Sequence, residues 1–297
     1  NLPDNTDALS VGGFVKLDLS AGVFGLAYTT DSGNDYSVSS LATNNIDITS
    51  SPDGDKLYVS SEGGYISEFT LSTAGDLSTA TNTHNYSHGV VNPKGVAFNA
   101  DGTVMYLSVW NTGNIRTFTL STAWDLSTIG SQTSATSVSG YSAGLQSFTW
   151  SHDGLYMFAS DNSGNMIRYT VQTAWTPYDG TKQTVNPSDV GIIGGFDFND
   201  DGTKLVTGGW SPANTIYEHS LSTPYDLTTL SYDGSYTITD SDVQGIAISN
   251  DNSRLWVMGQ NTDKIYQYNT LSTPVVDNTK LLGLNGATIS VGTTTAS

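Results

Sequence analysis

An eleven-residue segment that recurs along the chain constrains the fold more than any other feature. Residues 118–128 read FTLSTAWDLST, and related segments occupy residues 69–79, 169–179, 219–229 and 268–274. Each copy follows a turn aspartate flanked by short apolar runs. The turn aspartates are Asp53, Asp101, Asp153, Asp201 and Asp251, spaced by 48, 52, 48 and 50 residues. A repeat of about fifty residues with several short strands is typical of a β-propeller rather than a helical solenoid.

A short apolar run precedes each turn aspartate. These runs cover residues 46–48, 96–98, 148–150, 196–198 and 246–248. Large apolar side chains alternate in them, which predicts inner strands that pack against neighbouring blades. The glycine after most of the turn aspartates supplies the left-handed backbone that a tight hairpin needs. The sequence has no long amphipathic helical pattern, so we expect almost no helix.

Counting the repeats predicts a ring of six blades. Five complete blades would span residues 39–88, 89–139, 140–187, 188–239 and 240–285. A sixth would combine three strands from residues 1–38 with one strand from residues 286–297, because residues 286–291 resemble residues 245–250. Pairing strands from both termini would protect the free sheet edges. We therefore expect a single all-β domain over residues 1–297, a six-bladed β-propeller with four antiparallel strands per blade.

Charge and composition exclude several classes of partner. The chain has 10 basic and 28 acidic residues, and a net charge of -18 repels nucleic acid and anionic lipid. No apolar run approaches the roughly 18 residues of a membrane span, so we expect neither nucleic-acid binding nor membrane insertion. The absence of cysteine excludes disulfides and thiol catalysis. A surface rich in Ser, Thr and Asn suits an extracellular protein, and a start at Asn1 suggests a processed product.

The repeated LSTAWD motif should form the turn that leads to the outer strand of each blade. Its Ser, Thr and Asp side chains can bond to nearby backbone, while Trp124, Trp175 and Tyr225 would cover the blade edge. Repetition in most blades favours this structural role. The alternative is a repeated ligand pocket, as in propeller lectins.

Residues 96–108 read VAFNADGTVMYLS, and the FTLSTAWDLST segment follows them. This pattern resembles the propeller repeats common in marine phage and bacterial proteins and, more loosely, the YVTN and lactonase-like propellers. The resemblance covers nearly the whole chain. It implies a propeller fold but little about function, because propellers serve as enzymes, lectins, adhesins and structural virion parts.

Two loops of each blade should share one face around the axis, and aromatic residues fall there. Nine residues beyond the turn aspartates lie Glu62, Trp110, Trp210 and Gln260. Exposed indole rings would provide stacking platforms for sugars or apolar groups. The alternative is that both tryptophans are plugs between blades.

Polar residues stand just before most of the inner strands. At this position the sequence has Asn44, Lys94, Gln146 and Gln244, with Gly194 and Asn285 in the remaining repeats. They would form a ring at the mouth of the axial channel, or else satisfy loop backbone and water. The predicted ligand-binding residues are therefore Asn44, Lys94, Trp110, Gln146, Trp210 and Gln244.

Two aspartates occupy inner strands three repeats apart. Asp47 and Asp197 would lie in opposite blades of a six-bladed ring, where their carboxylates could hold calcium or another cation. The favoured alternative is that each caps backbone amides between blades. No other cofactor is expected, and no catalytic residues are assigned, because the sequence has no nucleophile elbow, Walker loop or zinc-protease motif.

The function expected from these observations is a non-enzymatic extracellular module for binding or structure. Such a module would be a virion tail or capsid-surface protein, or a cell-surface adhesin, with other structural subunits or surface glycans as partners. One rival is a lactonase- or glycosidase-like hydrolase that uses Asp47, Asp197 or Glu62 with a metal. The other is an architectural filament subunit.

Overall fold

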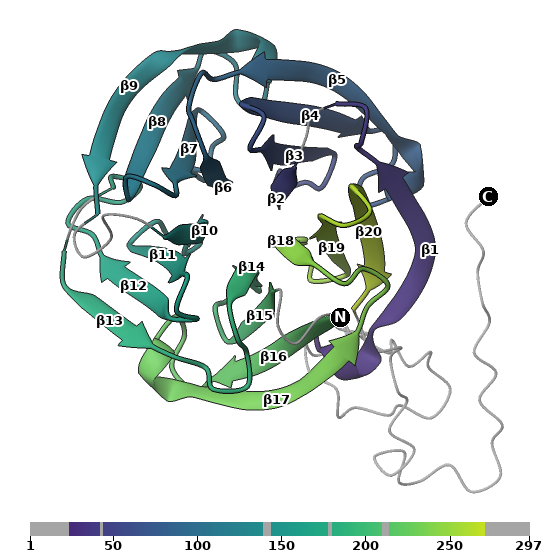
Figure 1. The fold of residues 1–297 in the computed structure, drawn as a ribbon, viewed down its shortest axis with the longest axis vertical. Coiled ribbons are helices and arrows are strands. Elements are labelled where there is room, and N and C mark those ends of the chain that lie inside the picture. The colour runs from purple at the N-terminus through teal and green to yellow at the C-terminus, as the bar shows by residue number, and fades with distance from the viewer. Residues whose placement is uncertain (1–23, 42–43, 139–143, 178–179, 210–213, 271–297) are drawn as a thin grey trace, which may run out of the picture.

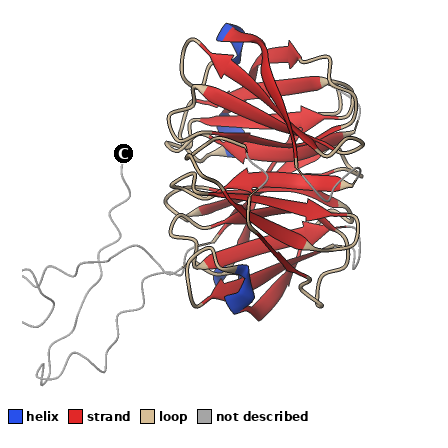
Figure 2. Ribbon diagram, turned by 90° about the vertical axis from the view of Figure 1, so that its left-hand side faces the viewer, coloured by secondary structure: helices blue, strands red, loops and turns tan. Residues whose placement is uncertain are grey.

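A computed structural model shows five four-stranded antiparallel sheets arranged as blades around one axis (Figure 1). It describes residues 24–41, 44–138, 144–177, 180–209 and 214–270. Seen from the side, the strands form a disc with loops on its two faces (Figure 2). The predicted β-propeller fold and its repeat architecture are therefore confirmed.

The blades follow the chain in order, and each runs from an inner to an outer strand. The first contains β2 (Asn45–Ser50), β3 (Lys56–Ser61), β4 (Tyr65–Leu71) and β5 (Ala80–Ser87). The second contains β6 (Pro93–Phe98), β7 (Val104–Val109), β8 (Asn114–Leu120) and β9 (Ile129–Ser137). The third contains β10 (Leu145–Trp150), β11 (Tyr156–Asp161), β12 (Met166–Thr170) and β13 (Lys182–Val185). The fourth contains β14 (Ile193–Phe198), β15 (Lys204–Gly209), β16 (Thr215–Leu221) and β17 (Leu230–Thr237).

The fifth blade is completed by the N-terminal part of the chain. It contains β18 (Val243–Ile248), β19 (Arg254–Gly259) and β20 (Lys264–Asn269). Its outermost strand is β1 (Thr30–Ser37), which pairs antiparallel with β20 and places Thr30 opposite Asn269. The inner strand β18 packs directly against β2 of the first blade, so the ring is closed.

The prediction of six blades is wrong. The last of the three strands expected in residues 1–38 was assigned to a sixth blade, whereas β1 is the outer strand of the fifth. Because β1 completes the fifth blade and β18 packs directly against β2, the ring has no place for a sixth blade. The other strands assigned to a sixth blade, in residues 1–23 and 286–297, lie outside the described residues.

Apolar contacts between neighbouring blades form the core. One cluster joins Tyr58 of β3 to Val96, Phe98 and Met105 of the next blade, all of them buried. The predicted inner strands are confirmed as β2, β6, β10, β14 and β18. Helix is limited, in the part of the chain that the structure describes, to the three-residue 3-10 turns η1 (Leu26–Tyr28), η2 (Leu77–Thr79), η3 (Leu126–Thr128) and η4 (Leu227–Thr229).

The repeated motif is the turn that leads to the outer strand, as predicted. Asp125 caps η3 by accepting hydrogen bonds from the Ser127 backbone N–H at 2.9 Å and from its hydroxyl at 2.6 Å. The Trp124 ring packs on Gly102 of the Asp-Gly turn, where an added Cβ would lie 2.2 Å from the ring. Tyr58 of the preceding blade donates to the Trp124 carbonyl oxygen at 2.7 Å. The motif therefore fastens one blade to the next.

The described residues contain no helix long and apolar enough to cross a bilayer.

Candidate functional site

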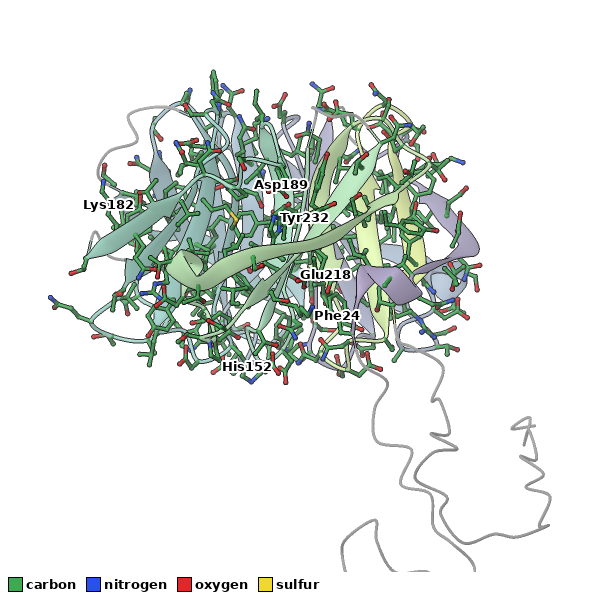
Figure 3. The ribbon with its side chains drawn as sticks, turned by 90° about the horizontal axis from the view of Figure 1, so that it is seen from below. Phe24, His152, Lys182, Asp189, Glu218 and Tyr232 are labelled. Carbon is green, nitrogen blue, oxygen red and sulfur yellow. The ribbon has the colours of Figure 1, made fainter. Side chains whose placement is uncertain are left out.

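The ring has two distinct faces because its strands alternate in direction. We call one the loop face; it carries the loops between the second and third strands and those between successive blades. The other, the turn face, carries the Asp-Gly turns between the first and second strands. Seen edge-on, Asp189 lies toward the loop face and His152 lies on the turn face (Figure 3).

A cavity of about 520 Å³ opens on the loop face near the axis. It is lined by Glu62, Asn92, Lys94, Trp110, Gln146, Asn162 and Ile192. The first three blades supply most of these residues, and the loop before β14 supplies Ile192. Three of the predicted ligand-binding residues therefore meet in one place, namely Lys94, Trp110 and Gln146.

An ion pair between buried Lys94 and partly exposed Glu62 forms one wall of this cavity. Lys94 is only 7% exposed, and its Nζ lies 2.5 Å from Oε1 of Glu62. Asn44 donates from Nδ2 to the other carboxylate oxygen at 3.1 Å. A buried ammonium group needs such a partner because removing a lone charge from water is costly. Asn44, another predicted ligand residue, thus acts on the cavity through Glu62.

Gln146 presents an unused hydrogen-bond acceptor. Its side chain is buried, and its Nε2 donates to Oδ1 of Asn162. Its Oε1 has no hydrogen-bond partner among the described residues. A buried acceptor without a donor costs roughly 1–3 kcal/mol, so a ligand that brings an N–H or O–H group to this atom gains that energy.

Trp110 is held as a platform at the edge of the cavity. Its backbone N–H donates to the Asn92 carbonyl at 3.0 Å, and its carbonyl accepts from Gly144 N–H at 2.6 Å. The residue is half-buried and lines the cavity. Trp210, its predicted counterpart, lies outside the described residues.

Gln244 lies buried near the start of β18 and bonds to a carboxylate. Its Nε2 donates to Oδ1 of Asp242 at 2.7 Å. Burial, helped by the neighbouring charge of Asp240, raises the pKa of Asp242 to about 6, and the charge of Lys94 opposes the shift. The loop face therefore carries a carboxyl group whose pKa is raised toward neutrality.

The aspartates Asp47 and Asp197 occupy inner strands, but they do not oppose each other across the axis. In a ring of five no blade lies opposite another, and β2 and β14 are separated by β18 alone on their shorter side. Asp47 accepts from the Val96 N–H and Asp197 from the Ile248 N–H, both at 2.9 Å. Each carboxylate therefore caps the inner strand of the following blade, which is the alternative that the sequence favoured.

Burial changes the titration of both axial aspartates. It raises the pKa of Asp197 to about 7 and that of Asp47 well above its usual range, and the nearby charge of Asp197 adds to the shift of Asp47. Both line a space of about 10 Å³ between the inner strands, roughly the size of one water molecule. Nowhere in the described ranges do three or more His, Asp or Glu side chains gather as metal ligands.

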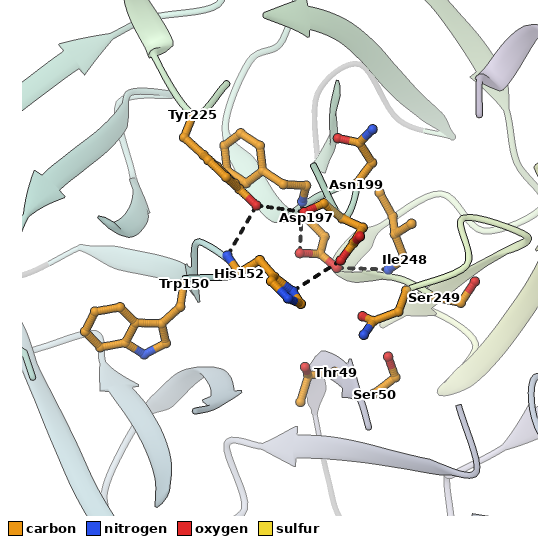
Figure 4. A pocket seen from close by; sticks show the side chains of 12 residues that line it. Thr49, Ser50, Trp150, His152, Asp197, Asn199, Tyr225, Ile248 and Ser249 are labelled. Atoms are coloured by element: carbon orange, nitrogen blue, oxygen red, sulfur yellow. Dashed lines mark hydrogen bonds and ion pairs between the residues drawn. The ribbon is translucent and has the colours of Figure 1, made fainter. Parts of the chain in front are cut away.

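A smaller pocket of about 120 Å³ opens at the axis on the turn face (Figure 4). Asp197 reaches it from within the ring, and His152 and Tyr225 stand at its edge. The His152 backbone N–H donates to the Tyr225 hydroxyl at 3.2 Å, and that hydroxyl donates to the Asp200 backbone carbonyl at 3.1 Å. Sequence reasoning assigned His152 no role, and its position beside a turn aspartate was the only available signal.

The cavity also contains residues that the sequence did not single out. Asn92 and Ile192 stand nine residues before the turn aspartates Asp101 and Asp201, and Asn162 stands nine residues after Asp153, so the repeat could have identified all three. Lys94, Trp110 and Gln146 also occupy fixed offsets, and the sequence singled them out by their polar or aromatic side chains.

Comparison with known proteins supports the fold. No protein-family model matches the sequence, and a search of curated proteins found no match. Among solved structures, the ring is similar to glutaminyl cyclase from Myxococcus xanthus, with a TM-score of 0.57 and 13% identity over 82% of this chain and 97% of that chain. A functionally unknown protein from Desulfotomaculum acetoxidans gives a TM-score of 0.44 and 14% identity, over 74% of this chain and 64% of that one. At such identities the glutaminyl cyclase similarity indicates the propeller fold alone.

Proposed function

We propose that the protein is a non-enzymatic binding module that recognises a carbohydrate in the loop-face cavity. The observation that carries the proposal is the meeting of an indole ring, an ion pair and an unpaired amide oxygen in one cavity. Trp110 supplies the ring, Lys94 and Glu62 the ion pair, and Gln146 the oxygen.

A sugar ring matches this chemistry with both its apolar face and its polar edge. Its C–H face stacks on an indole, while its hydroxyl groups donate and accept hydrogen bonds at the edge. The Gln146 oxygen can accept a hydrogen bond from a sugar hydroxyl group. The Lys94 ammonium can donate to sugar oxygens, and the Glu62 carboxylate can accept from sugar hydroxyl groups. A cavity of about 520 Å³ falls within the usual range of roughly 300–1,000 Å³ for small-molecule sites.

The proposed setting is extracellular, as part of a virion surface or a cell-surface adhesin. The resemblance of the repeats to phage and bacterial propellers supports this setting, as does the low content of basic residues. A net charge of -18 keeps such a protein away from nucleic acid and anionic lipid, which leaves neutral surface glycans as favoured partners.

Glycan binding by the intact protein tests the proposal. A panel of surface glycans should yield a binder, and calorimetry should show that Trp110→Ala lowers its affinity about tenfold or more. Tyr232→Ala removes an exposed aromatic side chain on outer strand β17 and should leave the affinity unchanged. Equal affinities of wild type and Trp110→Ala would contradict the proposal. Burial of more than about 1,000 Å² of the loop face against another subunit in native particles would instead indicate an architectural filament subunit.

A hydrolase is the second candidate, and the pKa of Asp197 favours it. A carboxyl group with a pKa of about 7 can act as a general acid near neutral pH. Asp197 lines the turn-face pocket beside His152 and Tyr225. Lactone and glycoside substrates should be assayed with and without Ca²⁺, and Asp197→Asn should abolish any turnover. Turnover that survives this substitution would remove Asp197 from the mechanism.

A further inference from the structure

An aromatic side chain occupies one repeated position in four of the five blades. The position immediately precedes the residue that caps the 3-10 turn before the outer strand. In the third blade, where no such turn is described, it is the position that aligns with it in the repeat. It is held by Phe24, Trp124, Trp175 and Tyr225. Each of these side chains is buried or partly buried against the core of its own or the preceding blade. In the first blade the same position is Gly75.

The backbone around Gly75 is the same as in the second, third and fourth blades, so only the side chain is missing. Gly75 N–H donates to the Gly54 carbonyl at 2.9 Å, as Trp124 N–H donates to that of Gly102 at 3.0 Å. The φ angles are 73° at Gly75 and 60° at Trp124. An indole ring covers Gly102, whereas the nearest atom above Gly54 is the backbone nitrogen of Gly75, at 3.5 Å from the position of an added Cβ.

A cavity of about 190 Å³ lies where this side chain is missing. Its walls include Asp53, Gly54, Gly75, Asp251, Ser253 and Arg254. A volume of about 150 Å³ is enough to hold benzene, so this space, whose walls are mostly polar, is large enough for an aromatic ring. It opens at the Asp-Gly turns, and therefore on the turn face, away from the loop-face cavity.

Arg254 provides a cationic wall for this cavity. Its Nε donates to the Gly75 carbonyl at 3.2 Å, and its Nη1 donates to the Ser253 carbonyl at 3.0 Å. Its Cγ lies 3.5 Å from the position that a Cβ on Gly75 would occupy. These bonds hold the guanidinium plane at the cavity, where it can stack on an aromatic face.

We propose that this cavity is a binding site for a planar aromatic ring, which takes the place of the missing side chain. The flat backbone of Gly54 and Gly75 contacts one part of the ring, and the Arg254 guanidinium contacts its π-electrons. The carboxylates of Asp53 and Asp251 accept from an N–H or O–H group on the ring edge. The site therefore favours an indole or a phenol over benzene. The proposal does not depend on the glycan-binding function.

The ring can belong to a free small molecule or to an aromatic side chain of a peptide, and the chemistry is the same for both. Indole and N-acetyltryptophanamide separate these sources, because the second probe carries peptide groups next to the ring. Tighter binding of the amide would identify a peptide side chain as the occupant. Binding of indole alone would identify a free small molecule.

Amide chemical shifts of the full chain during titration with indole provide the test. The Gly54, Gly75 and Arg254 signals should shift saturably, with a dissociation constant of about 1 mM for a ligand of this size. Gly75→Trp restores the side chain that the second blade carries at φ 60°, and it should abolish these shifts. Gly75→Ala is the matched control, which leaves the cavity open and should keep binding.

The reciprocal substitution keeps the proposal testable if Gly75→Trp does not fold. Trp124→Gly opens the equivalent space above Gly102 and should create indole-dependent shifts there, together with a rise in melting temperature on adding indole. The proposal is overturned if indole shifts none of the three wild-type signals. It is also overturned if Gly75→Trp folds and binds indole as wild type does.

Discussion

Protonation of the Asp197 carboxyl group is coupled to folding of the protein. Its side chain accepts backbone N–H bonds from Phe198 and Ile248, each at 2.9 Å, while burial raises its pKa from 3.8 to about 7. The folded protein therefore holds this proton more tightly than the unfolded chain does. The stabilisation is complete below about pH 4 and is lost as the pH rises through 7.

Asp197→Asn should reduce this dependence of stability on pH, while Asp47 and Asp242, whose pKa values are also raised, keep their contributions. Each unit of pKa shift corresponds to about 1.4 kcal/mol, so Asp197 contributes up to about 4 kcal/mol to the change in the free energy of unfolding between pH 4 and pH 8. Urea unfolding of both proteins across this range measures the difference. Asp101→Asn is the control, because the pKa of exposed Asp101 is lowered, so its effect on stability is confined to the acid end of this range. Parallel curves for wild type and Asp197→Asn would contradict the assignment.

Single residues were predictable from the sequence where the repeat fixed their position. Lys94, Trp110 and Gln146 stand at constant offsets from the turn aspartates and line one cavity. The unpaired oxygen of Gln146 was not predictable, because it depends on how the Gln146 and Asn162 side chains are oriented toward each other. The pairing of Lys94 with Glu62 likewise depends on how two neighbouring blades pack.

At the scale of elements, a polar side chain in the third strand holds the 3-10 turn of the next blade. Glu68 accepts from Leu126 N–H at 2.8 Å, and Gln267 accepts from Leu77 N–H at 2.6 Å. Glu218 accepts from Leu26 N–H at 2.5 Å. These buried bonds join blades through the backbone, in addition to the apolar contacts.

Glu68→Ala should destabilise the ring more than Glu68→Gln. The alanine leaves the Leu126 N–H unpaired and removes the partner of Lys56, whose Nζ lies 2.7 Å from Glu68. We expect a loss of about 2–3 kcal/mol in the free energy of unfolding. Glutamine keeps an acceptor oxygen, as Gln267 does in the fifth blade, so its loss should be about half as large or less. Chemical denaturation measures both, and equal losses would show that the acceptor is unimportant.

At the scale of the whole molecule, the sequence predicted the fold but not the number of blades. Five turn aspartates equal the five blades observed. A sixth blade was predicted because the strands expected at the two chain ends were assigned to a sheet of their own. A single strand at the edge of β20 is enough to close a ring, and the sequence of β1 does not reveal which sheet it joins. That choice depends on the packing of β18 against β2, which is a contact between the two ends of the repeat array.

Removing β1 should destabilise the ring as a whole. A chain that begins at residue 38 exposes the edge of β20 and loses the ion pair between Lys264 and Asp35, whose charged atoms are 3.0 Å apart. Its melting temperature should fall and its tendency to aggregate should rise. A chain that begins at residue 24 keeps Phe24, η1 and β1 and is the control. Identical melting of the two truncated chains would show that closure by β1 does not stabilise the ring.

Closure by β1 also imposes an order on biosynthesis. The ribosome makes β1 before every other described strand, but β20, its partner, is made last. Four blades can form while β1 is still unpaired, and closure of the ring is then the final step of folding. An unpaired strand can cause aggregation. The sequence of β1, TDSGNDYS, opposes this because it has two aspartates, a glycine and no aliphatic side chain. The strand that closes the ring is thus one that can remain in water until translation reaches its partner.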